Sequence, residues 1–97
     1  MRILAIEHEN VGLTHDNFKP HLYNEAAQAW ELYQSGLIRQ IDFCKERSAA
    51  VILLECEDLD HARQVLATLP LVEAGLITFE LLTLSAYPGF ARLFESK

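Results

Sequence analysis

Apolar residues fill positions 49–54 without interruption, and this run opens the segment around which the rest of the chain is arranged. A strand with one face in water alternates apolar and polar residues, so an unbroken run indicates a strand that is covered on both faces. We expect this strand to end near Glu55 or Cys56. Asp58 can cap a short helix that follows. The predicted buried stripe of that helix consists of Leu59, Ala62, Val65, Leu66 and Leu69.

Three further segments have the character of strands. Residues 2–8 contain an apolar run, which predicts a central strand that is again covered on both faces. Residues 76–84 are apolar on both sides apart from Glu80 and two threonines. Residues 37–44 form the most polar strand, which suits the edge of a sheet. We expect Arg39, Ile41 and Phe43 on one side of it, and the other side to carry Ile38, Gln40, Asp42 and Cys44.

The first helix is predicted between a cap near Asp16 or Asn17 and Ser35, with Gly36 as its stop. Pro20 fits only within the first turn of that helix. Its expected core stripe recurs at intervals of three and four residues and consists of Phe18, Leu22, Ala26, Ala29 and Tyr33. Trp30 falls at the edge of this stripe, where it could cover the seam between helix and sheet or face a partner subunit.

The second helix must stop at Pro70, and residues 71–75 are expected to be a connector. The resulting order of elements is β-α-β-β-α-β. This order predicts the ferredoxin-like α+β fold, a four-stranded antiparallel sheet with both helices on one face. Residues 1–97 then form a single domain with its core at 2–84 and a C-terminal tail at 85–97.

Two helices can cover only one face of such a sheet, although at least three of the strands are apolar on both faces. A monomer would expose a larger apolar patch than proteins in water usually carry. The pattern therefore predicts a homodimer or a higher homo-oligomer, with two sheets face to face around a central cavity, as in dimeric α/β barrels. The tail places Phe90, Leu93 and Phe94 at helical spacing, and it is either a frayed end or docks across the subunit boundary.

The two cysteines are expected to be buried free thiols in a reducing compartment. A charged turn at residues 45–47 would join two strands into a hairpin that pairs Cys44 with Ser48. Cys56 then lies about 27 Å further along the strand, at ~3.4 Å per residue. This separation is beyond the reach of a disulfide.

The charge pattern narrows the set of partners. The net charge is −6, from 14 acidic and 8 basic residues, and the basic residues are scattered without forming a patch. Nucleic acid and anionic membranes are therefore disfavoured as partners. The sequence has no signal-peptide pattern and no apolar segment approaching the ~20 residues that span a bilayer, so a cytoplasmic location is expected.

At Gly36, at Arg39 and at Leu69-Pro70-Leu71 the chain resembles the muconolactone isomerase family of dimeric α/β barrels. In that family a long first helix ends in glycine, an arginine follows three residues later, and the second helix ends in Leu-Pro-Leu. The resemblance implies proton transfer without a cofactor, on a small unsaturated lactone or a related acid. It also makes Leu69-Pro70-Leu71 a candidate cavity rim. Val72-Glu73-Ala74 departs from the Phe-Pro and aromatic residue that the family carries next.

Three residues are candidates for proton-transfer chemistry. Glu80 has apolar neighbours, and burial would raise its pKa, but it could also face solvent or pair with Arg39. Arg39 could bind a substrate carboxylate through both of its terminal nitrogens, or form an ion pair. His8 is a candidate general base, or simply a hydrogen-bonded histidine at a strand end.

Aromatic residues are candidates for substrate binding. We expect Arg39, Trp30, Tyr33 and Tyr87 to line such a site, although packing is the simpler role for Tyr33. His21 and Glu25 are four residues apart on the first helix and could share a metal, with His15 nearby. Their number and spacing match no established zinc pattern, so a solvated pair is expected. No metal or cofactor is predicted.

The leading hypothesis is an isomerase-like protein that moves a proton on a small organic acid, lactone or aromatic compound bound in the barrel cavity. The alternative is a non-catalytic module for small-molecule binding or for assembly. An enzyme would bring Arg39, His8 or Glu80 together at one open cavity, whereas a module would leave them scattered or paired. Haem or oxygen chemistry is a third hypothesis, and it would require a histidine pointing into the cavity.

Overall fold

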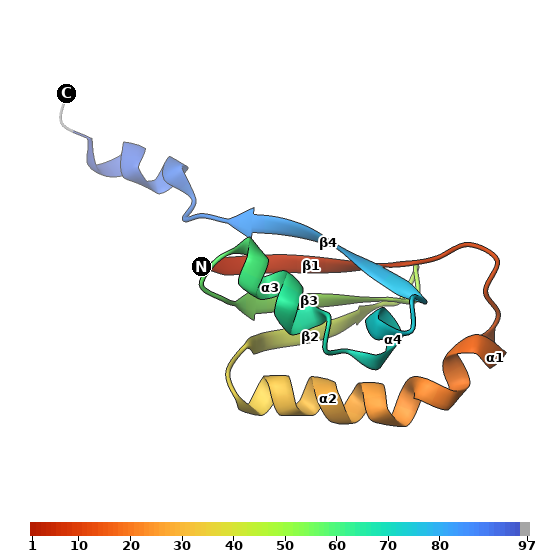
Figure 1. The fold of residues 1–97 in the computed structure, drawn as a ribbon. Coiled ribbons are helices and arrows are strands. Elements are labelled where there is room, and N and C mark those ends of the chain that lie inside the picture. The colour runs from red at the N-terminus through yellow and green to blue at the C-terminus, as the bar shows by residue number, and fades with distance from the viewer. Residues whose placement is uncertain (96–97) are drawn as a thin grey trace.

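The computed structural model describes residues 1–95 and contains the predicted order of strands and helices (Figure 1). The strands are β1 (Arg2–Glu9), β2 (Ile38–Cys44), β3 (Ala49–Glu55) and β4 (Ile77–Leu84). The α-helices are α1 (His15–Phe18), α2 (Leu22–Gln34), α3 (Leu59–Leu66) and α4 (Pro70–Glu73). Two 3₁₀ segments complete the elements, η1 (Lys19–His21) between α1 and α2 and η2 (Pro88–Phe94) after β4.

The four strands form one sheet in the order β2-β3-β1-β4 within the described residues. Strand β1 is central and runs antiparallel to both β3 and β4, while β2 pairs antiparallel with β3 at one edge. This topology is the ferredoxin-like arrangement, so the predicted fold class is confirmed. The central place of β1 and the edge place of β2 are confirmed as well.

The core lies between one face of the sheet and the helices. Ile3 and Ala5 on β1 and Ile52 and Leu54 on β3 have at most 1% of their surface exposed. They form one cluster with residues of the helices and of the segment between α3 and α4, namely Leu32, Ala62, Val65, Leu66 and Leu69. Because side chains alternate along a strand, this cluster defines the helix-facing side of the sheet.

The opposite face of the sheet, which we call the open face, is also largely apolar. Its centre is made by Leu4 and Ile6 of β1 and by Val51 and Leu53 of β3, which pair with each other across the two strands. Leu82 of β4 lies beside Leu4 and has 42% of its surface exposed. All four helices in the described residues lie on the other side or beyond the sheet's ends, so these apolar side chains face solvent in the single chain (Figure 1).

The first helical segment begins earlier than predicted. Thr14 is the N-cap of α1, and Asn17 closes a capping box with it, so the predicted cap near Asp16 or Asn17 is wrong. Pro20 lies in the 3₁₀ turn η1, because a proline cannot continue an α-helical hydrogen-bond ladder. The predicted stop is confirmed, since Gly36 has φ +88°, a conformation that a residue with a Cβ adopts at a cost.

Strand β2 contains a bulge that changes which side chains share a face. Ile38 pairs with Leu54, but the next register pair is Gln40 with Leu53, so Arg39 is the extra residue. Ile38 therefore lies in the core with 1% exposure, on the same side as Ile41, and its predicted placement with Gln40 is wrong. Sequence alternation alone does not reveal a bulge.

The hairpin between β2 and β3 also differs from the prediction. Cys44 pairs with Ala49 rather than with Ser48, so the turn has one residue more than expected. Ser48 accommodates this by taking a left-handed backbone conformation, with φ 50°. Both cysteines are free thiols, and Cys56 is buried as predicted, whereas Cys44 is only half-buried.

The second helical region is split in two. The Asp58 carboxylate accepts a hydrogen bond from the His61 backbone N–H at 2.7 Å, so the predicted cap of α3 is confirmed. Helix α3 ends at Leu66, and Pro70 then occupies the first position of α4. The predicted connector at residues 71–75 is therefore partly helical.

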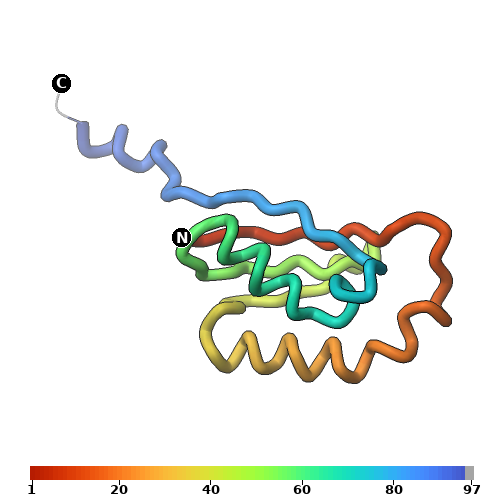
Figure 2. Tube along the Cα trace, in the orientation of Figure 1, coloured from red at the N-terminus to blue at the C-terminus, as the bar shows by residue number. Residues whose placement is uncertain are grey.

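The C-terminal tail projects beyond the end of β4, away from the rest of the domain (Figures 1 and 2). Its segment η2 exposes large apolar side chains, with 65% of Phe90, 75% of Leu93 and 84% of Phe94 accessible to solvent. The tail stretches the chain to a radius of gyration of 16.1 Å, against about 12–13 Å for a compact domain of this length. No helix in the described residues is long and apolar enough to cross a membrane.

The substitution Leu54→Ala should test the helix-facing core. Leu54 is fully buried at the centre of the cluster, so we expect the free energy of unfolding to fall by about 2–5 kcal/mol. Val11→Ala removes two methyl groups from a side chain that is 97% exposed, and it should change stability by less than about 0.5 kcal/mol. Urea titrations of both variants give the comparison, and equal stabilities would contradict the assigned core.

Candidate functional site

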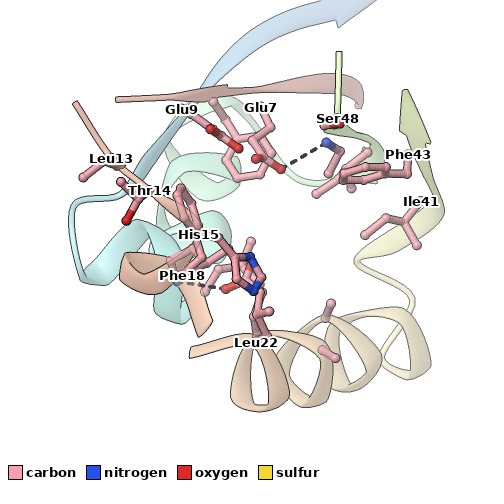
Figure 3. Close-up of a pocket in the computed structure, with 18 residues that line it drawn as sticks. Glu7, Glu9, Leu13, Thr14, His15, Phe18, Leu22, Ile41, Phe43 and Ser48 are labelled. Atoms are coloured by element: carbon pink, nitrogen blue, oxygen red, sulfur yellow. Dashed lines mark hydrogen bonds between the residues drawn. The ribbon is translucent and has the colours of Figure 1, made fainter. Parts of the chain in front are cut away.

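A cavity of about 560 Å³ lies between the helix-facing side of the sheet and the helices α1 and α2. This volume is in the range of small-molecule sites, about 300–1,000 Å³. Figure 3 shows Glu7, Ile41 and Phe43 of the sheet on one side of the cavity and His15, Phe18 and Leu22 on the other. The remaining lining residues are Glu9, Leu13, Thr14, Glu25, Ala26, Ala29, Ser48, Ala50, Ile52, Leu69, Leu71 and Phe79.

Glu7 is the most enclosed carboxylate of this cavity. It follows Ile3 and Ala5 on the helix-facing side of β1 and has 8% of its surface exposed. One carboxylate oxygen accepts a hydrogen bond from the Ala50 backbone N–H at 3.0 Å (Figure 3). Burial raises the pKa of Glu7 above its ordinary value of 4.5, the Ala50 hydrogen bond opposes this rise, and the charge of Glu9 adds to it.

Glu25 is a second carboxylate in the lining of the cavity, and it comes from α2. Its side chain accepts a hydrogen bond from the Leu71 backbone N–H at 2.9 Å, which ties α2 to the first turn of α4. Burial raises the pKa of Glu25 as well. The Leu71 hydrogen bond lowers that pKa, the charge of Glu7 raises it, and the charge of His21 lowers it slightly.

The two carboxyl groups have the properties that proton-transfer chemistry requires. Both are held by the backbone, both have pKa values shifted toward neutrality by an apolar environment, and each feels the charge of its neighbours. A carboxylate of this kind can accept a proton from carbon, and its protonated form can donate a hydrogen bond to a developing oxyanion. His15 and Thr14 lie at the same cavity but are exposed.

The structure places two of the predicted catalytic residues on the open face, outside this cavity. His8 and Glu80 lie on adjacent strands, and the His8 Nε2 atom is 3.2 Å from a Glu80 carboxylate oxygen. Their side chains are about half exposed, at 45% and 52%. Glu80 therefore pairs with His8 and not with Arg39.

Arg39, Trp30 and Tyr33 come together elsewhere, in a second groove between α2 and β2. Trp30 and Tyr33 are stacked, with ring centroids 5.7 Å apart and an angle of 25° between the rings. Tyr33 has 47% of its surface exposed, so its expected place in the core stripe is wrong. Tyr87 lies in the tail, where its ring is nearly perpendicular to that of Phe90 and the two ring centroids are 5.0 Å apart.

Arg39, His8 and Glu80 therefore do not converge on one cavity within the single chain. Their predicted catalytic roles stay predictions. The carboxylates that do share a cavity, Glu7 and Glu25, are not among the predicted catalytic residues. The sequence pattern indicates Glu25 as a partner of His21, in a solvated pair or at a shared metal. The available signal for Glu7 was its position, two residues after Ala5 in the buried row of a central strand.

Leu69 and Leu71, part of the candidate cavity rim, do line the cavity, but it lies within one chain rather than between two. In the described part of the chain no three histidine, cysteine or acidic side chains are grouped to hold a metal ion. The lining therefore offers hydrogen-bonding and acid-base groups within a largely apolar wall.

No protein-family model matches the chain, and no curated protein matches it at a significant level. Among solved structures, nine chains match. One of them is 5-chloro-2-hydroxyhydroquinone dehydrochlorinase (TftG) from Burkholderia phenoliruptrix AC1100, solved in complex with 2,5-dihydroxybenzoquinone. The two chains share 15% sequence identity at a TM-score of 0.65, over 92% of this chain and 98% of that chain.

At this identity the likeness shows the fold alone. The chain shares its ferredoxin-like fold with that protein over nearly its whole length, which agrees with the fold class predicted from the sequence. The match does not separate the muconolactone isomerase family from other proteins of the same fold.

The raised pKa values predict a specific pH dependence of stability. The folded protein binds the protons of Glu7 and Glu25 more tightly than the unfolded chain does, whose carboxyls titrate near 4.5. Their contribution is fully present below pH 4.5 and is lost as the pH rises through the raised values. Glu7→Gln keeps an acceptor for the Ala50 N–H and should therefore flatten this loss of unfolding free energy.

Urea unfolding at a series of pH values above 4.5 measures this effect. Glu57→Gln serves as the control, because it removes an exposed carboxyl that lies outside the cavity lining. The control should lose stability with rising pH as the parent protein does. Identical pH profiles for Glu7→Gln and the parent protein would refute the raised pKa of Glu7.

Proposed function

We propose that the protein binds a small organic acid, lactone or aromatic compound in the cavity of each chain and moves a proton on it without a cofactor. One observation carries this proposal: two carboxyl groups with raised pKa values, Glu7 and Glu25, line one apolar cavity of substrate size. Glu7 is buried and Glu25 is half-buried, and neither is in an ion pair among the described residues. Carboxyls with raised pKa values in a cleft of this kind are typical of acid-base sites.

The proposed reaction needs only groups that the chain supplies. Glu7 as a carboxylate takes a proton from a carbon next to a carbonyl group. The electron pair of that C–H bond forms a C=C bond, and the π pair of the carbonyl group moves onto its oxygen. Glu25 in its protonated form donates a hydrogen bond to this oxygen and stabilises the enolate. Return of the proton from Glu7 to another carbon of the conjugated system gives the isomer, and both carboxyls end in their starting state.

The comparisons are compatible with this class of substrate. TftG acts on a chlorinated hydroxyhydroquinone and binds a dihydroxybenzoquinone, and both are small, flat rings bearing oxygen atoms. Gly36, Arg39 and Leu69-Pro70-Leu71 favour a muconolactone isomerase-like activity, whereas Val72-Glu73-Ala74 departs from that family. We therefore expect the substrate to be a ring compound with an acidic C–H bond and a carbonyl group.

Hydrogen exchange in D₂O tests the proposal on two probes, muconolactone and 2,5-dihydroxybenzoquinone. We expect the protein to accelerate the loss of a ring C–H signal in proton NMR spectra of at least one probe. Glu7→Gln removes the base and should slow this exchange by about 10²–10⁴-fold. The control variant Glu57→Gln should keep the parent rate, because its carboxyl lies outside the cavity lining.

The same experiment separates the enzyme from the alternative module. Probes that bind without faster exchange would support a non-catalytic small-molecule-binding module of this fold. If exchange survives Glu7→Gln, Glu7 is not the base of the reaction. His8 and Glu80 would then be the candidates for that role.

We also propose that two copies of the chain associate through their open faces. Leu4, Ile6, Val51 and Leu53 form the centre of that face. They are half-buried by their neighbours in the sheet, and no helix of the described chain packs on them. Burial of apolar surface contributes roughly 25 cal/mol per Å², so a twofold contact would be favourable. The His8 and Glu80 pairs of both copies would border the space between the sheets, where any catalytic role of theirs would have to be exercised.

The tail belongs to the same proposal. The segment η2 extends away from the rest of the domain (Figure 2). It carries Phe90, Leu93 and Phe94, whose surfaces are 65%, 75% and 84% exposed. We propose that they dock on a second copy, which would remove from water the apolar surface that the single chain leaves exposed.

Sedimentation of the protein at micromolar concentration should show a species of twice the chain mass of 11.0 kDa. Leu53→Lys places a charge at the centre of the open face and should shift the species to the monomer, because burying an unpaired ammonium is costly. Val11→Lys puts the same charge on a side chain that is 97% exposed and should remain dimeric. A parent protein that sediments as a monomer would refute this association.

A further inference from the structure

We infer that the groove between α2 and β2 is an anion subsite, which binds the carboxylate end of a flat, elongated substrate whose reacting end enters the Glu7 cavity. The groove has a volume of about 620 Å³ and is lined by Ala26, Ala29, Trp30, Tyr33, Arg39, Gln40 and Ile41. This inference rests on the proposed function and narrows its substrate class to aromatic or unsaturated ring carboxylates.

The groove has an aromatic wall that the core does not use. Trp30 and Tyr33 lie one turn apart on α2 and expose 58% and 47% of their surfaces, yet their rings are stacked on each other. Exposed aromatic rings contribute little to the stability of the single chain, but they offer a flat apolar surface to a planar ligand. Stacking on such rings favours planar and conjugated compounds over aliphatic ones.

Arg39 supplies the positive charge of the groove and is held in place by the backbone. Its Nε atom donates a hydrogen bond to the Gly36 carbonyl at 2.8 Å, and the bulge in β2 sets the backbone position from which it extends. None of the ion pairs among the described residues includes Arg39. A guanidinium fixed through Nε can offer its two terminal nitrogens to the two oxygens of a carboxylate.

The groove adjoins the Glu7 cavity. Ala26, Ala29 and Ile41 line both spaces, so the two lie side by side. The proposed ligand would extend from Arg39 across these residues toward the carboxyl groups. The two ends have opposite electrostatic character, with a cation at the outer end and Glu7, Glu9 and Glu25 at the inner end. An anionic substrate is therefore oriented with its carboxylate at Arg39 and its uncharged, reacting part at Glu7.

Fluorescence of Trp30 tests the subsite directly, because this residue is the only tryptophan in the sequence. The probes are 4-hydroxybenzoate and its neutral analogue 4-hydroxybenzamide, titrated near neutral pH into the full-length protein. We expect the acid to bind at least about tenfold more tightly than the amide, since a hydrogen bond to a charged group contributes more than a neutral one. Equal binding of acid and amide, or no saturable change with the acid, would overturn the subsite.

The variants assign the preference to one side chain. Arg39→Met should abolish the preference for the acid, and Arg39→Lys should retain only part of it, because an ammonium cannot bind both oxygens in the same fork geometry. Arg47→Met removes an equal charge from the exposed turn and should keep the preference. Equal losses in Arg39→Met and Arg47→Met would show that only net charge matters and would refute the subsite.

Glu7→Gln separates this inference from the proposed reaction. The substitution leaves the groove intact, so the preference for 4-hydroxybenzoate should persist while hydrogen exchange is lost. Exchange that depends on Glu7 without an acid preference would sustain the proposed function and eliminate the subsite. An acid preference without any exchange would keep the subsite and reduce the protein to a binding module.

Discussion

Glu7 stands where the helix-facing core would otherwise continue along the central strand. Ile3 and Ala5 precede it in the same row and are fully buried, and the row then meets a carboxylate with 8% exposure. Enclosing an ionised carboxylate in an apolar contact costs several kcal/mol unless hydrogen bonds compensate. The structure instead has a cavity between this end of the sheet and the helices α1 and α2, and one backbone N–H is directed at Glu7. This arrangement costs less free energy than close apolar packing around the carboxylate would.

The same constraint explains the uneven helical layer. At one end of the sheet, Ala62, Val65 and Leu66 of α3 close tightly on the sheet. At the other end, α1, η1 and α2 pass over the cavity, and Leu32 is the only residue of α2 that is buried. Glu25 compensates partly for this looser contact, because its bond to the Leu71 N–H fixes α2 to α4. The main chain, and not other side chains, therefore orients both carboxylates of the site.

The sequence predicts the fold well because the signals for it are local. The apolar runs, Gly36, Asp58 and Pro70 mark strands, stops and caps within a few residues of where the structure has them. The errors arise where the relevant information is not local. The bulge at Arg39 depends on the register with β3, and the burial of Glu7 and Glu25 depends on which helix end lies above which strand.

The sequence does not predict the candidate site for the same reason, because the site depends on non-local contacts. The residue types of Arg39, Trp30 and Tyr33 make them candidates for binding, and the structure brings them together in one groove. His8 and Glu80 can both transfer protons, but the alternation of side chains along β1 and β4 places them on the face opposite Glu7. A carboxylate at a buried position of a central strand was the more informative signal, because such a position has an energetic cost that a purely structural role does not explain.

The residues proposed for association and the residues proposed for proton transfer lie on opposite faces of the sheet. The apolar residues that the proposed association would bury lie on the open face, whereas the cavity with Glu7 and Glu25 lies on the helix-facing side and is lined by residues of one chain. Side chains on opposite faces of one sheet do not touch, so a charge placed at Leu53 can disrupt association without entering the cavity. The proposed association would influence the site only by making the strands that both faces share more rigid. The substrate would then not need a central cavity between the two sheets.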